Sequence, residues 1–450
     1  MINKTKLHFT LILFLLVFLL AGNSVARADG HLTGVNLDLG LLNRSISDAL
    51  EPFIEEFEEE TGASVTMEQH AFDSLHDKMM LEFAAGTGYF DIVYNSPGYM
   101  GTLIENDYIL ALDDYYEESD IDRDKFLDAA FEINRHEGEE TWGFPYLADT
   151  TVMFYREDLL NDPEYQEEFE EEYGYELAVP ETTDEFLDVA EFFTRDTTGD
   201  GNIDLYGFGY PQIGVAYGNL YIMPWVWTFG GEYYDEDYYS TLDQPEVLEA
   251  VKFAEELQEY QPDGVLGWEY GEHFTRFVEG DLAMSAGWFH MGLEVNDPEI
   301  SDVAGDVGYA TMPYAPDSGL ETGKTVLGGG GLAIAADSDN PDAAFEFLEW
   351  MFADHDRAVD WFLEAGGFTM PEVLEDPAVE ERYPWSIDFF PVAEYALENM
   401  ARQRPTLPEA HSIFEITSEM WHNVATGEET PEEAVETAHE RLDNLLEDRR

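Results

Sequence analysis

A run of four glycines that leads into an apolar stretch constrains this 450-residue chain more than any other segment. Residues 328–331 are all glycine, and residues 332–336 have the length and apolar character of a buried strand. Asp339 or Asn340 can cap a following helix, and Pro341 suits its first turn. The glycines let the backbone take a positive φ or approach another surface closely, and a mobile loop is the alternative interpretation.

The residues after this strand carry a helical pattern and a family resemblance. Four apolar side chains recur at helical spacing: Ala344, Phe347, Leu348 and Met351. A glycine cluster before L-A-I, followed by N-P-D-A-A-F-E-F-L-E-W-M, resembles the extracellular solute-binding proteins of ABC importers. The likeness is greatest to the sugar-binding branch that includes maltose-binding protein, and it runs from about residue 36 to the C-terminus.

The resemblance implies an α/β fold of the two-lobed periplasmic-binding-protein type. Each lobe is then a mixed β-sheet flanked by helices, and hinge segments join the two lobes. Three further motifs support it: F-D-I-V-Y-N-S-P at 90–97, the G-F-P-Y segment within 141–160, and L-A-M-S-A-G-W-F at 282–289. The lobes expected from these motifs are 29–148 plus 275–335 for the first, and 149–274 plus 336–450 for the second.

Residues at strand ends and hinges are the first candidates for ligand contact. Ligands of open parallel sheets lie beyond the carboxyl ends of the strands, which selects Asn95, Ser96 and Tyr99, although a plain turn is the alternative. Tyr146 and Asp149 stand where the resemblance places a hinge, with hinge packing as the alternative. The predicted ligand-binding set is Trp288, Trp225, Trp227, Tyr146, Asp149, Asn95, Ser96, Tyr99, Gly329 and Gly330.

The tryptophans enter this set because flat rings suit the apolar face of a sugar ring, while polar groups take its hydroxyls. Trp225 and Trp227 are two residues apart, so they share a face in a strand but not in a helix. Trp288 ends the L-A-M-S-A-G-W-F motif, where relatives carry an aromatic residue at the pocket. The alternative for all three is a tryptophan-rich core.

The segment D-T-T-G-D-G-N-I-D-L-Y-G over 196–207 has the spacing of a calcium-binding loop. Its oxygen donors are Asp196, Thr198, Asp200, Asn202 through its backbone carbonyl, and Asp204. The twelfth position is Gly207 rather than the usual bidentate glutamate. A structural Ca²⁺ and a tight turn without metal remain alternatives, and no other cofactor is expected.

Asp and Glu number 98 against 20 Lys and Arg, which gives a formal charge of −78. Such a surface repels nucleic acid and anionic lipid, so neither is an expected partner. The mutual repulsion of these carboxylates is screened in concentrated salt. We interpret the composition as that of a protein from a salt-adapted organism.

The N-terminus has the layout of a secretory signal peptide over 1–28. Lys4 and Lys6 precede an apolar run at 7–21, and V-A-R-A offers a cleavage site before Asp29. The chain has no cysteine, which excludes disulfides and also a lipid anchor on a cysteine after the signal. The sequence therefore predicts a soluble periplasmic protein.

The sequence gives little support for catalysis. It contains no G-x-S-x-G, no H-E-x-x-H and no phosphate-binding loop. The predicted function is a non-enzymatic, monomeric binding component that captures a mono- or oligosaccharide between its lobes and delivers it to a membrane permease. The same fold holding a polyamine or a compatible solute is one alternative, and a secreted glycoside hydrolase is a remote one.

Overall fold

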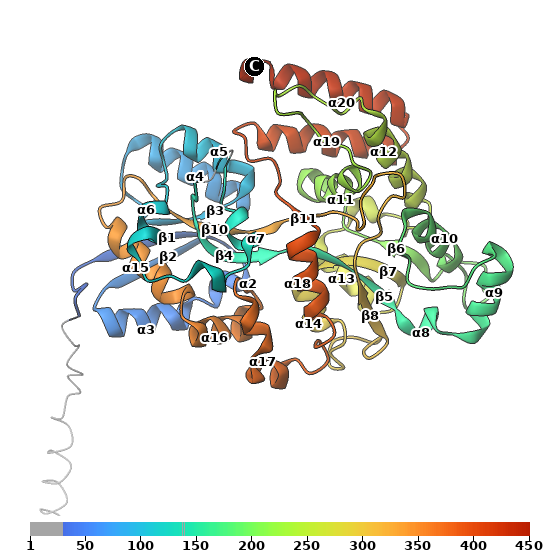
Figure 1. The fold of residues 1–450 in the computed structure, drawn as a ribbon, viewed down its shortest axis with the longest axis horizontal. Coiled ribbons are helices and arrows are strands. Elements are labelled where there is room, and N and C mark those ends of the chain that lie inside the picture. The colour runs from blue at the N-terminus through green and yellow to red at the C-terminus, as the bar shows by residue number, and fades with distance from the viewer. Residues whose placement is uncertain (1–29, 137, 139) are drawn as a thin grey trace, which may run out of the picture.

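The computed structural model describes residues 30–450 apart from residues 137 and 139, so the expected signal peptide lies outside the described residues. Two mixed β-sheets lie in separate lobes, and helices flank both (Figure 1). This confirms the two-lobed α/β fold. Within the described residues, no helix is long and apolar enough to cross a membrane.

The first lobe is built on a five-stranded sheet of order β2-β1-β3-β10-β4. Its strands are β1 (Asn36–Leu42), β2 (Ser64–His70), β3 (Ile92–Asn95), β4 (Phe144–Asp149) and β10 (Gly328–Ile334). Its helices are α2 (Ser45–Asp48), α3 (Glu51–Thr61), α4 (Phe72–Ala85), α5 (Pro97–Glu105), α6 (Asp113–Glu118), α7 (Asp128–Glu132), α15 (Pro341–Phe352) and α16 (His355–Ala365). In Figure 1, α3 and α15 lie on one side of this sheet and α4 and α5 on the other.

The second lobe is built on a four-stranded sheet of order β6-β7-β5-β8. Its strands are β5 (Thr151–Arg156), β6 (Tyr206–Gly209), β7 (Leu282–Trp288) and β8 (Val307–Ala310). The helices around it are α8 (Glu157–Leu160), α9 (Pro163–Tyr173), α10 (Thr183–Phe193), α11 (Gly214–Thr228), α12 (Pro245–Gln258), α13 (Tyr270–Val278) and α14 (Phe289–Glu294). Thr182 and Glu185 form a reciprocal capping box at the start of α10, as the T-T-D-E sequence allows.

A short two-stranded ribbon lies where the chain crosses between the lobes. β9 (Thr325–Val326) pairs in parallel with β11 (Ala401–Arg402), and β9 leads through Leu327 into β10. Thr150, between β4 and β5, is hydrogen-bonded through its Oγ1 to Thr325 Oγ1 at 2.7 Å and donates to Val326 O at 3.0 Å. These contacts fasten two crossing segments side by side and form the hinge.

Four C-terminal helices lie at the top, between the lobes and at the lower edge of the molecule as drawn in Figure 1. They are α17 (Pro377–Arg382), α18 (Phe390–Asn399), α19 (Ala410–Ala425) and α20 (Pro431–Leu445). α19 packs on α11 and α20 of the second lobe and also reaches α5 of the first (Figure 1). The C-terminal segment therefore belongs to neither lobe alone.

The strand pairing divides the chain differently from the lobe limits expected from the sequence. β7 and β8 lie within 275–335, which we assigned to the first lobe, yet both pair with β5 in the second sheet. α15 lies within 336–450, which we assigned to the second lobe, yet it packs on β10 and β4 of the first. The two expected limits need this correction because an apolar pattern identifies a buried strand without identifying its neighbours.

The glycine run is a strand and not a mobile loop. β10 begins at Gly328 and lies between β3 and β4, antiparallel to both. A Cβ on Gly330 would stand 2.6 Å from Tyr94 Oη, and a Cβ on Gly331 would stand 1.7 Å from Asn134 Oδ1. Gly329 has a φ of +89°, which residues other than glycine rarely adopt. The glycines are therefore required by close packing at the centre of the sheet.

Candidate ligand-binding cleft

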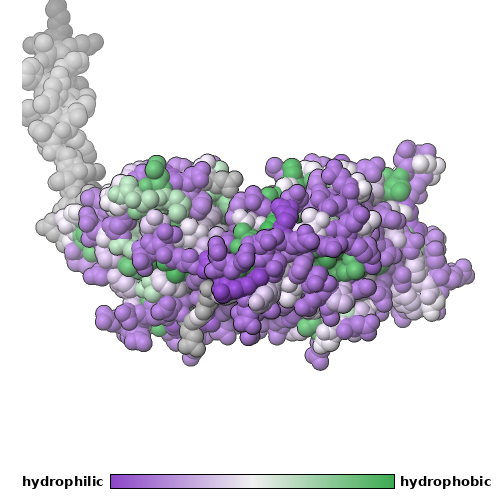
Figure 2. Space-filling view, turned by 90° about the horizontal axis from the view of Figure 1, so that it is seen from above, coloured by the Kyte–Doolittle hydropathy of each residue, from purple (hydrophilic) through white to green (hydrophobic). Residues whose placement is uncertain are grey.

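The carboxyl ends of strands from both sheets meet beside the hinge. β4 ends at Asp149, β7 ends at Trp288, and the register pairs Trp288 with Thr151, the first residue of β5. From above, the molecule is notched between its two lobes, and hydrophilic residues cover most of the visible surface (Figure 2). Strand ends of this kind are the usual location of ligand sites in α/β folds.

Seven polar side chains from the two lobes and the hinge interact electrostatically at this place, and we call them the cleft cluster. Arg44 interacts with Asp149 and with His290, Asp149 interacts with Tyr270, and Arg404 interacts with Tyr210. The cleft cluster consists of Arg44, Tyr94 and Asp149 from the first lobe, Tyr210, Tyr270 and His290 from the second, and Arg404 after the hinge strand β11. It combines hydroxyls, a carboxyl and two guanidinium groups in one crevice.

Asp149 is the carboxyl of the cleft cluster. Its Oδ1 accepts a hydrogen bond from the backbone N–H of Phe289 at 3.0 Å, which ties the end of β4 to the end of β7. Burial raises the pKa of Asp149 to about 7, although hydrogen bonds from Phe289 and Thr150 and the charge of Arg44 act in the opposite direction. Near neutral pH this carboxyl is therefore available both as a donor and as an acceptor.

Among the basic members of the cleft cluster, Arg404 is partly buried, whereas Arg44 and His290 reach solvent. Burial lowers the pKa of Arg404, and the like charge of Arg44 lowers it further. The Nε of Arg404 is buried and has no hydrogen-bond partner among the described residues. The pKa of His290 falls to about 4 because of the surrounding protein and the charge of Arg44, so its ring is neutral at physiological pH.

Glycines form one wall of the cleft. The hydroxyl of Tyr94 donates to the carbonyl of Gly329 at 2.9 Å. A Cβ on Gly328 would approach the ring of Trp288 to 2.3 Å, so Trp288 lies directly against the start of β10. This contact with the glycine backbone places the half-buried ring of Trp288 at the junction of the lobes, where a ligand-binding residue is expected.

Arg404 also borders an open pocket beside the hinge. The pocket leaves about 200 Å³ for the centres of water-sized spheres, far more than a single water molecule needs. Its lining residues are Trp227, Glu232, Tyr233, Tyr234, Arg402, Gln403, Arg404, Pro405 and Thr406. Arg402 forms an ion pair with Glu232 at 2.8 Å and stacks over Trp227 at 4.9 Å, so both charges at this end are already partnered.

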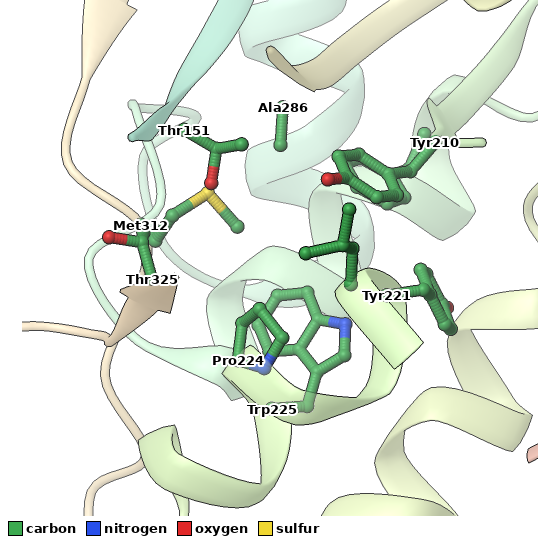
Figure 3. A pocket seen from close by; sticks show the side chains of 10 residues that line it. Thr151, Tyr210, Tyr221, Pro224, Trp225, Ala286, Met312 and Thr325 are labelled. Carbon is green, nitrogen blue, oxygen red and sulfur yellow. The ribbon is translucent and has the colours of Figure 1, made fainter. Parts of the chain in front are cut away.

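A second cavity lies inside the second lobe and is too small for a solute. Trp225, Tyr210 and Met312 border it together with Thr151 and Thr325 from the hinge (Figure 3). It leaves about 20 Å³ for the centre of a water-sized sphere, which is room for one water molecule. The cavity therefore does not compete with the cleft as a ligand site.

Trp225 and Trp227 border different cavities. They lie in α11, a helix, and accordingly do not share a face. Trp225 borders the small inner cavity and packs against Phe253 at 4.7 Å, whereas Trp227 borders the open pocket. The structure thus favours the core alternative for Trp225, and it keeps Trp227 near the cleft.

The remaining predicted residues lie near strand ends but are mostly enclosed. Asn95 is fully buried and its Nδ2 donates to Trp142 O at 3.2 Å, and Ser96 is 2% exposed. Tyr146 packs against Trp361 at 5.6 Å inside the first lobe, which favours the hinge-packing alternative. Tyr99 stacks on His76 at 4.7 Å while also interacting electrostatically with Arg404, so it borders the cleft.

The segment over 196–207 forms a compact loop closed by its own hydrogen bonds. Asp196 accepts from the backbone N–H groups of Gly199 and Gly201 at 2.7 Å and 2.6 Å. A Cβ on Gly207 would stand 1.9 Å from Ala190 O, so the position that supplies the bidentate ligand in calcium loops has no room for a side chain. In the part of the chain that the structure describes, no three His, Asp or Glu side chains are grouped as a metal site.

Five members of the cleft cluster are absent from the sequence-based candidates: Arg44, Tyr94, Tyr210, Tyr270 and Arg404. His290 is not among the sequence-based candidates either. Arg44 and Arg404 could have been selected from the sequence, because an Arg two residues after a strand end is unusual in a chain with so few basic residues. The tyrosines carried no such signal among the 25 tyrosines of the chain.

Comparison with known proteins decides the family. Residues 43–357 match the bacterial extracellular solute-binding protein family. The chain belongs to this family. The family's members bind solutes and do not transform them, so this solute-binding protein is not an enzyme, and it is exported or periplasmic.

Relatives of this solute-binding protein cover nearly its whole length. A probable amino-acid ABC transporter periplasmic-binding protein of Sinorhizobium fredii is 22% identical, covering 89% of this chain and 86% of its own. An ABC transporter solute-binding protein of Agrobacterium radiobacter K84, solved with ribitol, has a TM-score of 0.76 at 25% identity, covering 92% of this chain and 99% of its own. Maltose-bound MalE3 of T. maritima has a TM-score of 0.71 at 22% identity, covering 92% and 100%.

Proposed function

We propose that this solute-binding protein captures a small polyhydroxy solute, a sugar or a sugar alcohol, in the cleft between its lobes. The observation that carries the proposal is the cleft cluster itself, in which strand ends of both sheets present hydroxyl, carboxyl and guanidinium groups to one crevice. The structural neighbours solved with ribitol and with maltose support the same class of ligand. The neighbouring open pocket, with about 200 Å³ for the centres of water-sized spheres, offers further room beside the cleft.

Capture in such a cleft works by closure of the lobes. Ligand contacts that exist only when both lobes touch the solute shift the equilibrium toward the closed form. The closed protein then delivers the solute to the membrane subunits of its ABC importer. We infer that it does so in the periplasm and as a monomer.

A thermal-shift panel tests this function. Purified protein is mixed with sugars, sugar alcohols, polyamines, compatible solutes and amino acids, the last because one relative is named for them. A ligand at 100 times its Kd stabilises the native state by about 2.7 kcal/mol, which raises Tm by several degrees. We expect the rise from polyhydroxy solutes. Stabilisation by polyamines with no response to any polyhydroxy compound would contradict the proposal.

A further inference from the structure

Arginines are few in this chain, and almost every described one forms an ion pair or lies over an aromatic ring. With 98 acidic residues available, an arginine side chain should find a carboxylate without difficulty. Eight described arginines form ion pairs: Arg135, Arg156, Arg195, Arg276, Arg402, Arg441, Arg449 and Arg450. Arg123, Arg357 and Arg382 lie over aromatic rings. Arg44 and Arg404 do neither within the described part of the chain, and both belong to the cleft cluster.

The two unpaired arginines come from different parts of the chain and interact electrostatically with each other. Arg44 follows β1 in the first lobe, and Arg404 follows the hinge strand β11. Their charges repel each other, and the buried Nε of Arg404 has no hydrogen-bond partner among the described residues. Like charges that repel each other and a buried donor without a partner are both unfavourable, and an anion would relieve both.

The groups around these arginines do not cancel their charge. Asp149 interacts with Arg44, but its pKa of about 7 leaves it only partly ionised at neutral pH. His290 is neutral there, and the hydroxyls of Tyr94 and Tyr210 stay protonated because burial raises the pKa of both. Two guanidinium groups therefore outnumber the single carboxyl of the cleft cluster, in a molecule whose formal charge is −78. Over the Debye length of about 8 Å at physiological salt, the local charges dominate what a bound ligand experiences.

We propose that the solute held in this cleft is a polyol or sugar that carries one anionic group, a carboxylate or a phosphate monoester, bound by Arg404 and Arg44. The inference rests on the function proposed above and narrows its ligand class. Guanidinium groups match the planar geometry of carboxylate and phosphate oxygens, and such charge-assisted bonds are about twice as strong as neutral ones. The Tyr270 hydroxyl, which has no hydrogen-bond partner among the described residues, and Oδ2 of Asp149 are available for the ligand's hydroxyls. Polyamines are disfavoured, since both arginines would repel them.

The test is isothermal titration of the full-length mature protein with matched ligands. Each series keeps one carbon skeleton and changes one end: ribitol, D-ribonate and ribitol 5-phosphate, then D-sorbitol, D-gluconate and D-sorbitol 6-phosphate. In at least one series, we expect an anionic member to bind about tenfold or more tightly than the neutral polyol. The acid and phosphate arms show which anionic group the cleft accepts.

Variants assign the effect to the arginine. Arg404→Gln should remove the preference for the anionic member and change the affinity for the neutral polyol much less. Arg404→Lys keeps the charge but loses the planar fork, so it should retain part of the preference. Arg441→Gln is the matched control, because it makes the same change in net charge at an ion pair with Glu419 on the outer helices and should leave every affinity unchanged.

Three outcomes would overturn the inference. Neutral polyols or sugars that bind while all their anionic counterparts fail would contradict it and leave the proposed function intact. An Arg404→Gln variant that folds, as judged by its Tm, and loses neutral and anionic ligands equally would show that Arg404 only shapes the cleft. Failure of every polyhydroxy compound, neutral or anionic, would remove the proposed function together with the inference.

Discussion

At the scale of single residues, Asp149 links the architecture to the chemistry of the cleft. Its carboxyl joins the ends of β4 and β7 through the Phe289 N–H, and it lies among hydroxyls and guanidinium groups. Burial raises its pKa to about 7 from an ordinary value near 3.8. The native state therefore holds a proton on Asp149 at pH values where the unfolded chain has already lost it.

This difference predicts how Asp149→Asn changes the pH dependence of stability. Between pH 4 and pH 7 the native state binds more protons than the unfolded state, so Asp149 lowers stability progressively as pH rises through this window. Each pKa unit corresponds to about 1.4 kcal/mol. The asparagine variant should gain stability over the wild type as pH increases from 4 to 7.5, measured by urea unfolding at each pH. A constant difference between the two proteins would show that Asp149 titrates normally.

The glycines of β10 give a second prediction at this scale. Gly331→Ala would place a Cβ 1.7 Å from Oδ1 of Asn134, a fully buried side chain, in the middle of a sheet. Overpacking of this kind costs about 1–3 kcal/mol, so the urea midpoint should fall. Gly271→Ala in α13 is the control, because nothing lies within 4 Å of the added atom, and a helix favours alanine. Equal midpoints for the two variants would contradict the packing argument.

At the scale of elements, the loop over 196–207 has the contacts of a tight turn rather than those of a metal site. Both oxygens of Asp196 already accept backbone N–H groups, and the crowded Gly207 excludes the bidentate ligand. We therefore expect calorimetric titration of chelator-treated protein to show no binding up to millimolar Ca²⁺. Saturable heat in that range would contradict this, and its loss in an Asp196→Ala variant would locate the site in the loop.

Local patterns predicted most elements because their causes are local. Pro341 and the apolar residues behind it specify α15, and Gly86 ends α4 in the left-handed conformation expected of a C-terminal cap. The lobe limits failed because strand partners are chosen by contacts between distant parts of the chain. The same reason hid Arg44 and Arg404, which are 360 positions apart and meet only once the hinge is formed. The role of Trp225 stays a prediction, since composition does not separate a ligand-facing ring from a core ring.

At the scale of the whole molecule, charge governs stability. The formal charge of −78 produces self-repulsion that favours expansion of the chain, and salt screens it. Moving from dilute buffer to 1 M NaCl, where the Debye length is about 3 Å, should raise the Tm clearly. An equally concentrated uncharged osmolyte serves as the control for effects other than screening. A Tm that does not respond to NaCl would remove the interpretation that this is a protein of a salt-adapted organism.

The function of the whole molecule depends on the cleft between its two lobes. The strand ends, the hinge ribbon and the segment after β11 bring the cleft cluster together, although its members are spread from residue 44 to residue 404. The most direct measurement is a crystal structure of the protein with the polyhydroxy compound that raises its Tm most. The account predicts one molecule between the lobes, with Arg404 or Arg44 at its anionic end and Asp149 within hydrogen-bond distance of a hydroxyl. A ligand bound on an outer face, with the cleft cluster untouched, would contradict it.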